Sequence, residues 1–325
     1  MENKLKKVVQ WFVLVLSLIF IVHYFSKNEV YVQLALRIEA GKAIIVILLC
    51  ACYLLLQGYY YKVCLDKCSG NNIGFGPWFK IFILGRFLSN FVPLSGNVYR
   101  SICLKRIHGV SYTHYIGSFF TFFWLDSCLS FLLALIVIWD VNSDLQVGPF
   151  RALHVIAFLV ILFLCLPILS EKIFPLITIR FQRLAWLQSK LGEVLRVSVR
   201  NLRDVRFMAG FSLAGLGVFL LACAMFYVCF SSLGIHVGAA ELVFFYAFLK
   251  LSGYVSITPG NIGVQEILFG VISQQMQIGM AEGILASALL RVLSYVTLCC
   301  IAVPMGGLAL VRERSAYVDS DNNNP

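Results

Sequence analysis

Six apolar runs, each long enough to cross a membrane as a helix, constrain this chain more than any other feature. They cover residues 8–25, 43–61, 115–139, 152–169, 207–233 and 285–311. A bilayer core takes about 20 apolar residues in helical form. Because hydrocarbon offers no hydrogen-bond partners, the backbone of such a run must bond to itself, as it does in a helix. The runs therefore predict an all-α polytopic membrane protein.

The overall composition agrees with a bilayer as the solvent. Of the 325 residues 60% are hydrophobic and 13% are charged, and the mean hydropathy is +0.86. The net charge of +10 indicates basic cytoplasmic loops rather than a nucleic-acid surface. The 11 cysteines have no histidine at zinc spacing and no disulfide-like pattern, so we expect no metal site, no cofactor and no disulfide framework.

A stretch near residue 90 recurs in altered form about 160 residues later. Residues 88–92, Leu-Ser-Asn-Phe-Val, align with 251–255, Leu-Ser-Gly-Tyr-Val, and Gly96-Asn97 aligns with Gly260-Asn261. Both copies interrupt an apolar segment with Pro and Gly and carry ionisable residues. Interrupted segments at corresponding positions in two halves are typical of transporters built from internal repeats, whose site lies where the breaks meet.

The charges around the two interrupted segments predict their topology. The first, 77–102, has basic residues on both flanks and is expected to enter from the cytoplasm and return there. The second, 242–275, lies between sparsely charged loops and is expected to enter from the outer side. About six full spans plus two re-entrant hairpins then form an inverted repeat with both termini in the cytoplasm. In the main alternative, each hairpin arm spans the membrane fully.

The chain is expected to form a single transmembrane domain over residues 1–311. Its repeat halves are roughly 1–170 and 207–311, and a basic segment, 171–206, joins them. Apolar residues at helical spacing within 171–206 predict a cationic amphipathic helix on the cytoplasmic surface, although a solvated basic loop explains most of the same charge. Residues 312–325 are expected to be a disordered tail.

Ionisable side chains in the apolar segments are the candidates for function. Each costs roughly 2.5–3.5 kcal/mol on insertion scales and is expected to face protein or water. Four cations and two carboxylates leave a positive excess that suits an anionic ligand, with arginine forks matched to phosphate oxygens and helix N-termini at the breaks as further donors. With the Pro, Gly and Asn residues of the breaks, the candidate substrate-binding residues are Arg86, Asn90, Pro93, Gly96, Arg100, Asp126, Lys250, Pro259, Gly260, Gly263, Glu266 and Arg291.

A structural role is the alternative for the charged members of this set. Glu266 can pair with Arg291 or Lys250, and Asp126 with Arg86 or Arg100. Lys250 can also extend to the interface. We find no signature of a catalytic site in the sequence and assign no catalytic residue.

With these residues identified, the chain resembles the lysylphosphatidylglycerol synthase transmembrane family, also called flippase-like or UPF0104, over essentially its whole length. Asn90, Pro93, Gly96 and Arg100 are similar to the family's Asn-x-x-Pro-x-x-Gly-x-x-x-Arg motif. The stretch 259–266 is similar to its Pro, Gly and Glu element, and Arg291 with Pro304 and Gly306 to its last helix. The resemblance implies a lipid-binding membrane region. The soluble domain of the family's synthases does not follow the helices here, so synthase activity is not implied.

Two departures from the family pattern bear on the ligand. Asn97 stands where the family often has Glu, and Phe122 with Phe123 stand where it has an acidic and a basic residue shortly before the retained Asp126. These differences remove charges near the expected site and leave the lipid headgroup open.

We therefore expect a flippase-like protein of the bacterial inner membrane that binds and translocates an anionic lipid, either a phospholipid or a polyprenyl-phosphate-linked lipid. The expected partners are the anionic headgroup, the membrane, and either a second copy of the chain or an enzyme of glycan or lipid synthesis. Two alternatives remain open: a membrane-embedded transferase, and a scaffold that recruits a partner through 171–206. Enzymatic activity is less favoured than transport.

Overall fold

The computed structural model describes residues 39–92, 95–165, 204–254 and 258–307. Four parts of the sequence discussed above lie outside these residues: the first predicted span, the basic segment 171–206 up to residue 203, the C-terminal tail and Pro93. The described part is helical apart from one small hairpin, in which strand β1 (Gln146–Val147) pairs antiparallel with β2 (Phe150–Arg151). The expectation of an all-α membrane protein is confirmed.

Four described helices are long and apolar enough to cross a membrane. They are α3 (Ala40–Ser69), α6 (Tyr112–Asn142), α9 (Val205–Ser232) and α12 (Met280–Ala302). A shorter apolar helix covers Ala152–Cys165. Each falls on a predicted apolar run, but α3 continues eight residues beyond the predicted end at Tyr61 and includes Cys64 and Cys68. The count of six spans and the inverted repeat stay predictions.

Both interrupted segments form two helical arms separated by a break. In the first, α4 (Phe75–Phe91) and α5 (Ser95–His108) flank residues 92–94. In the second, α10 (Ala239–Tyr254) is followed by a short 3-10 turn, η2 (Pro259–Asn261), and then by α11 (Val264–Gln275). The matched stretches at 88 and 251 thus both lie at the C-terminal end of a first arm.

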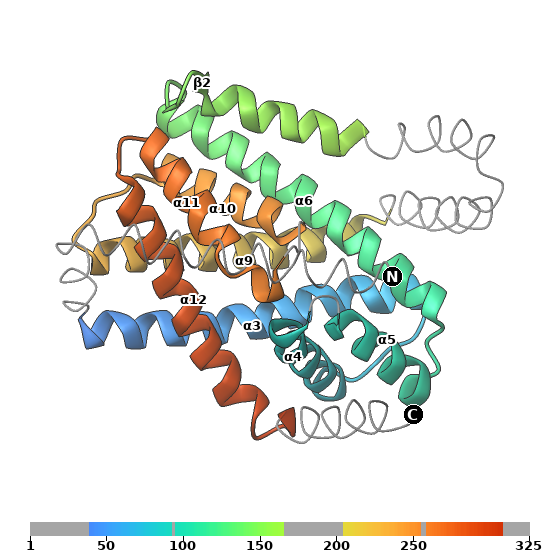
Figure 1. Ribbon diagram of the computed structural model, residues 1–325. Helices are drawn as coiled ribbons and strands as arrows, with labels where there is room; N and C mark the ends of the chain where they lie inside the picture. The colour runs from blue at the N-terminus through green and yellow to red at the C-terminus, as the bar shows by residue number, and fades with distance from the viewer. Residues whose placement is uncertain (1–38, 93–94, 166–203, 255–257, 308–325) are drawn as a thin grey trace, which may run out of the picture.

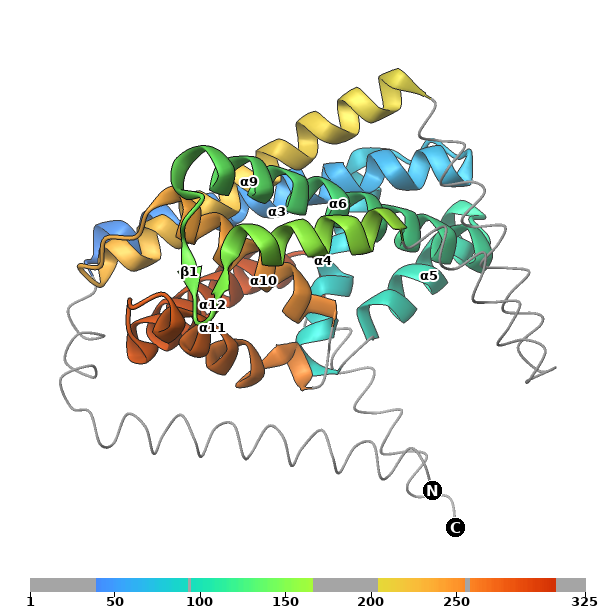
Figure 2. The same ribbon diagram turned by 90° about the horizontal axis from the view of Figure 1, so that it is seen from above.

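The long helices pack against the two interrupted segments. Helix α3 packs lengthwise against α9, and α12 crosses both of them. The first segment, α4 and α5, lies beside one part of α3, whereas α10 and α11 lie between α6 and α12 (Figure 1). The view from above shows the break of the second segment turned toward α4 (Figure 2), and α4 contacts η2 directly. Helix α4 of the first segment therefore meets the break of the second segment inside the helical assembly.

Local sequence explains where several helices begin and end. Gly70, in the left-handed region at φ 69°, closes α3 by donating its N–H to the Asp66 carbonyl at 3.0 Å. Ser111 caps α6, and its hydroxyl accepts from the N–H of His114 at 3.2 Å. Asp204 caps α9 through Oδ1, which accepts from the N–H groups of Arg206 and Phe207.

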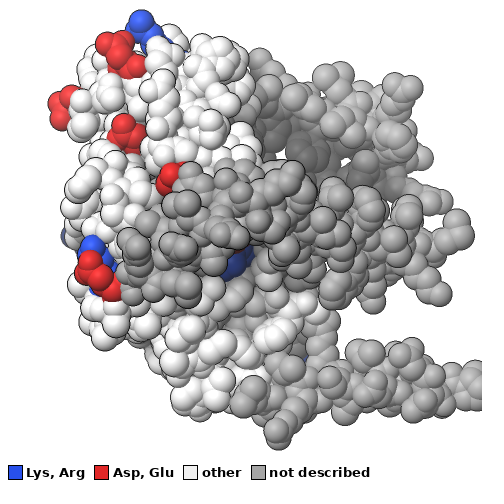
Figure 3. Space-filling view, turned by 60° about the vertical axis from the view of Figure 1, so that its left-hand side comes forward, with Lys and Arg blue, Asp and Glu red and all other residues white. Residues whose placement is uncertain are grey.

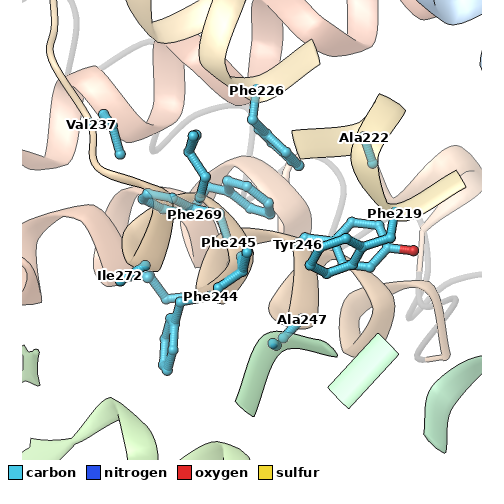
Figure 4. Close-up of a cluster of buried hydrophobic side chains, with 14 of the residues drawn as sticks. Phe219, Ala222, Phe226, Val237, Phe244, Phe245, Tyr246, Ala247, Phe269 and Ile272 are labelled. Carbon is cyan, nitrogen blue, oxygen red and sulfur yellow. The ribbon is translucent and has the colours of Figure 1, made fainter. Parts of the chain in front are cut away.

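The largest apolar core joins the second segment to the long helices. Phe219 and Phe226 of α9, Phe245 of α10 and Phe269 of α11 are buried together (Figure 4), and the Phe226 and Phe269 rings stack at 5.4 Å. Aromatic pairs of this kind add specific contacts to the burial of apolar area. This cluster fixes α10 and α11 and so positions the second break.

The outer surface of the described residues is rich in apolar side chains. Ile44, Leu48, Ile136, Leu213 and Leu220 are all exposed on the long helices. On the face that Figure 3 shows, the charged side chains of the described part are few and gather in small groups. Such a surface is suited to lipid rather than water, in agreement with an integral membrane protein.

Candidate functional site

The two interrupted segments line one cavity of about 320 Å³, here called the polar cavity. Ser89, Asn90, Asn97 and Arg100 reach it from the first interrupted segment, and Thr258, Gly260 and Asn261 from the second. Its remaining lining residues come from α3, α4 and α6: Gln57, Tyr61, Phe82, Arg86, Phe119, Phe122, Phe123 and Asp126. Residues about 160 positions apart in the sequence are therefore brought together at one site.

A second cavity of about 210 Å³, the inner cavity, adjoins the first. The two share Arg86, Asn90 and Gly260 as lining residues. The inner cavity extends between α3, α9, α10 and α12. Much of its wall is apolar and consists of Leu54, Ala222, Met225, Leu249, Leu290 and Leu298. Its other lining residues are Cys50, Tyr53, Gln265, Arg291, Ser294 and Tyr295. The shared residues form a partition between a polar and a more apolar space.

Close helix packing explains the glycines of the first break. A Cβ atom on Gly96 would overlap the carbonyl oxygen of Gly85, so α4 and α5 could not approach as they do. On Gly85, a Cβ would lie 2.6 Å from Nε of Arg100. Arg100 therefore lies over Gly85, and its guanidinium is 4.9 Å from the Phe82 ring. Gly96, a predicted site residue, thus acts through packing.

The second break is built from backbone that glycine and asparagine tolerate. Gly260, Asn261 and Gly263 have φ values of 60°, 55° and 84°, all in the left-handed region. The Thr258 hydroxyl donates to the Ile262 carbonyl at 2.9 Å and so closes the loop. Pro259 begins the 3-10 turn. These contacts hold an irregular backbone at a fixed place in the cavity wall.

Glu266 and Arg291 stabilise this break from within. Oε2 of Glu266 accepts from the N–H of Gly263 at 2.7 Å at the start of α11. Arg291, on α12, donates to Oε1 of Glu266, to the carbonyls of Gly260 and Asn261, and to Oε1 of Gln265. The predicted pairing of Glu266 with Arg291 is confirmed. The carboxylate also occupies the N-terminus of α11, which the sequence had suggested as a donor site for the ligand.

Asp126 has a different partner from the ones predicted. Oδ2 of Asp126, on α6, lies 2.5 Å from Nζ of Lys250, on α10, and both side chains are about nine-tenths buried. The expectation that Asp126 pairs with Arg86 or Arg100, or that Lys250 extends to the interface, was wrong. Because the sequence does not show which helices are neighbours, it could not identify the α6–α10 contact that joins these two residues.

These two pairings leave Arg86 and Arg100 as the uncompensated cations of the polar cavity. In the part of the chain that the structure describes, Arg86 donates to Oε1 of Gln57, and Arg100 donates to the Phe82 carbonyl at 3.2 Å and to Oδ1 of Asn97 at 3.5 Å. All these acceptors are neutral, and neither arginine forms an ion pair there. The positive excess predicted for the whole set is therefore concentrated on two neighbouring arginines.

Several wall residues were missed by sequence reasoning. Gln57 is a polar residue inside a predicted span, which is a signal that could have identified it. Tyr61, Phe82 and Phe119 gave no such signal because aromatic residues are common throughout the apolar runs. Phe122 and Phe123, noted as departures from the family pattern, lie in the cavity wall, so the missing charges are missing at the site itself.

Comparison with known protein families gives one assignment. The family model described as "Lysylphosphatidylglycerol synthase TM region" matches residues 7–302 of the chain. No curated protein and no solved structure matches the chain. The matched range includes both interrupted segments and every candidate residue of the cavity.

Proposed function

The chain belongs to the lysylphosphatidylglycerol synthase transmembrane family, and from this premise we propose that it binds an anionic lipid in the polar cavity and moves it across the bacterial inner membrane. Family membership and the apolar helices make it an integral membrane protein related to lipid handling. The finer statement, that an anionic headgroup is bound and translocated, rests on the chemistry of the cavity.

The observation that carries the proposal is the pair Arg86 and Arg100. Both line the polar cavity, and in the described residues both have neutral hydrogen-bond partners. Two cations without a counter-ion are costly in a low-dielectric region and are stabilised by an incoming anion. A phosphodiester fits because its oxygens match the planar fork of a guanidinium.

The other charged residues have supporting roles in this proposal. Lys250 is neutralised by Asp126, and Arg291 by Glu266, so neither is required as a counter-ion for the phosphate. Arg291 and Glu266 hold the second break, and Gly96 lets α5 pack closely so that Arg100 reaches the cavity. Asn90 and Gly260 belong to the partition between the two cavities.

Transport requires that the site open to each leaflet in turn. The proposed mechanism is a rearrangement of the two interrupted segments about the partition, while the arginines keep hold of the phosphate. The adjoining cavities support this mechanism because they place space on both sides of Arg86.

The two alternatives make different demands. A transferase with a polyprenyl-phosphate donor needs a general base and usually clustered carboxylates for a metal. Asp126 and Glu266 instead each have a basic partner. A scaffold would act through 171–206, which lies almost wholly outside the described residues.

The test is the accessibility of labelled headgroups in liposomes that contain the purified protein. An impermeant quencher is added, and the loss of signal from inner-leaflet lipid is followed for a panel of anionic phospholipids and a polyprenyl phosphate. The wild type is expected to accelerate the loss, and Arg100→Gln to abolish the acceleration. Arg106→Gln is the matched control, because Arg106 is an exposed residue of the same helix. Equal rates for the wild type and Arg100→Gln would overturn the proposal.

A further inference from the structure

Asn261 carries a buried hydrogen-bond acceptor that the protein does not use. It lines the polar cavity, and its side chain is buried, with 8% of the residue exposed. Within the described part of the chain, Oδ1 has no hydrogen-bond partner. A buried carbonyl oxygen without a donor is unfavourable, and native structures rarely leave one without a reason.

The orientation of the Asn261 amide is fixed by its other atom. Nδ2 donates to the carbonyl of Ser252 at 2.7 Å. If the amide were turned over, two oxygens would face each other there, so the partnerless atom is the acceptor Oδ1. The partnerless atom of this cavity-lining residue is therefore one that accepts a hydrogen bond and cannot donate one.

Asn261 is also held firmly in place. Its N–H donates to the Thr258 carbonyl at 3.0 Å, and its own carbonyl accepts from Arg291 at 3.2 Å. With φ at 55° its backbone is in a region that asparagine tolerates better than most residues. An acceptor that is fixed on both sides can select a ligand, because it does not turn away to find another donor.

The neighbouring asparagine of the cavity differs in this respect. Oδ1 of Asn97 accepts from Arg100 and, at 3.3 Å, from the hydroxyl of Tyr115. Oδ1 of Asn97 is thus satisfied by the protein itself, whereas Oδ1 of Asn261 requires a donor from outside.

Resting on the proposed function, we infer that Asn261 determines headgroup specificity by accepting a hydrogen bond from an O–H or N–H group of the lipid. The ligand then has two features, a phosphate for Arg86 and Arg100 and a donor near that phosphate for Asn261. A lipid whose phosphate bears only a methyl group, or whose amine is quaternary, meets the first requirement and fails the second.

Two matched pairs of labelled lipids test the inference in the liposome assay. Phosphatidylglycerol has hydroxyl groups that phosphatidylmethanol lacks, at the same net charge. Phosphatidylethanolamine has N–H groups that phosphatidylcholine lacks. The wild type is expected to move the donor-bearing member of one pair about tenfold faster, as one net hydrogen bond implies. The pair that shows the preference identifies the donor as hydroxyl or ammonium.

The variant Asn261→Gly removes the acceptor and suits the left-handed backbone. It is expected to reduce the preference to about one, so that any change in the overall rate is the same for both lipids of a pair. Thr258→Val is the matched control. It removes the hydrogen bond from the Thr258 hydroxyl to the Ile262 carbonyl in the same break but leaves Oδ1 of Asn261 in place, so the preference should be kept. A merely structural role for Asn261 would slow all four lipids equally.

The outcomes separate this inference from the function on which it rests. Equal rates within both pairs, as expected if an ordered water satisfies Oδ1, would overturn the inference and leave lipid translocation standing. A preference that persists in Asn261→Gly would also overturn it. If the wild type moves none of the lipids, the proposed function itself fails.

Discussion

Nζ of Lys250 lies 2.5 Å from Oδ2 of Asp126, so a cation of α10 and a carboxylate of α6 neutralise each other at the edge of the polar cavity. The pair ties the first arm of the second interrupted segment to a long helix. Because Lys250 is neutralised by Asp126, only Arg86 and Arg100 remain, among the described residues, as cations of the polar cavity that can bind an anionic ligand.

Replacing one member of this pair should cost more than replacing both. Asp126→Leu leaves the Lys250 ammonium buried and unpaired, and we expect a loss of about 3–5 kcal/mol in the free energy of unfolding. Asp126→Leu combined with Lys250→Met should be close to the wild type. The measurement is unfolding in mixed micelles with increasing SDS. Additive losses in the double variant would show that the two charges are not coupled.

Arg291 should not tolerate replacement by lysine, although the charge is kept. Its guanidinium donates to four acceptors of the second break, and a lysine ammonium cannot reproduce that planar arrangement. We expect Arg291→Lys to reduce the free energy of unfolding by about 1–3 kcal/mol. Arg151→Lys is the control, since Arg151 forms an exposed pair with Asp144 at 3.2 Å and should change stability by less than about 0.5 kcal/mol. Equal effects of the two substitutions would contradict the assigned role.

Gly96→Ala should separate the arms of the first segment. The added methyl group would overlap the Gly85 carbonyl, which belongs to the backbone and has little room to move. The expected loss is about 1–3 kcal/mol, together with slower lipid movement. Gly253→Ala in α10 is the matched substitution, because a Cβ there has no atom within 4 Å. If Gly96→Ala behaves like Gly253→Ala, the close approach of α4 and α5 is not required.

The start of α9 should weaken in acid. The Lys67 ammonium, 2.5 Å from Oδ2 of Asp204, is the main cause that lowers the pKa of this carboxyl below its usual value, and the N–H of Phe207 acts in the same direction. Because the pKa is lower in the folded state, the stabilisation is present above the unfolded-state pKa and is lost as pH falls through the folded-state pKa. The stability difference between wild type and Asp204→Asn should therefore disappear on acidification. A difference that is independent of pH would rule out the ionised carboxylate as its source.

The sequence predicted the helical architecture because solvation by lipid acts on whole runs of residues. The apolar runs gave α6 and α9 to within about three residues, and the Pro and Gly positions located both breaks. Helix α3 was predicted too short because the apolar run ends at Tyr61, whereas the helix continues through charged residues that include Lys62, Asp66 and Lys67. Lys62 and Asp66 instead pair within the helix.

The site was predicted less completely because it depends on which helices are neighbours. The ionisable residues could be selected individually, since each is unusual in an apolar run. Their partners could not, so Asp126 was assigned to arginines rather than to Lys250. Asn261 was noted in the repeat, but its partnerless oxygen depends on a single rotation fixed by the Ser252 carbonyl.

The most direct test of the central claim is equilibrium binding of a fluorescent phosphatidylglycerol to the purified protein in detergent. Arg86→Gln and Arg100→Gln should each weaken binding about tenfold or more, since each removes a charge-assisted contact to phosphate, and the double variant should weaken it further. Arg106→Gln should bind as the wild type does. Unchanged affinity in the double variant would contradict the assignment of the polar cavity as an anionic-lipid site.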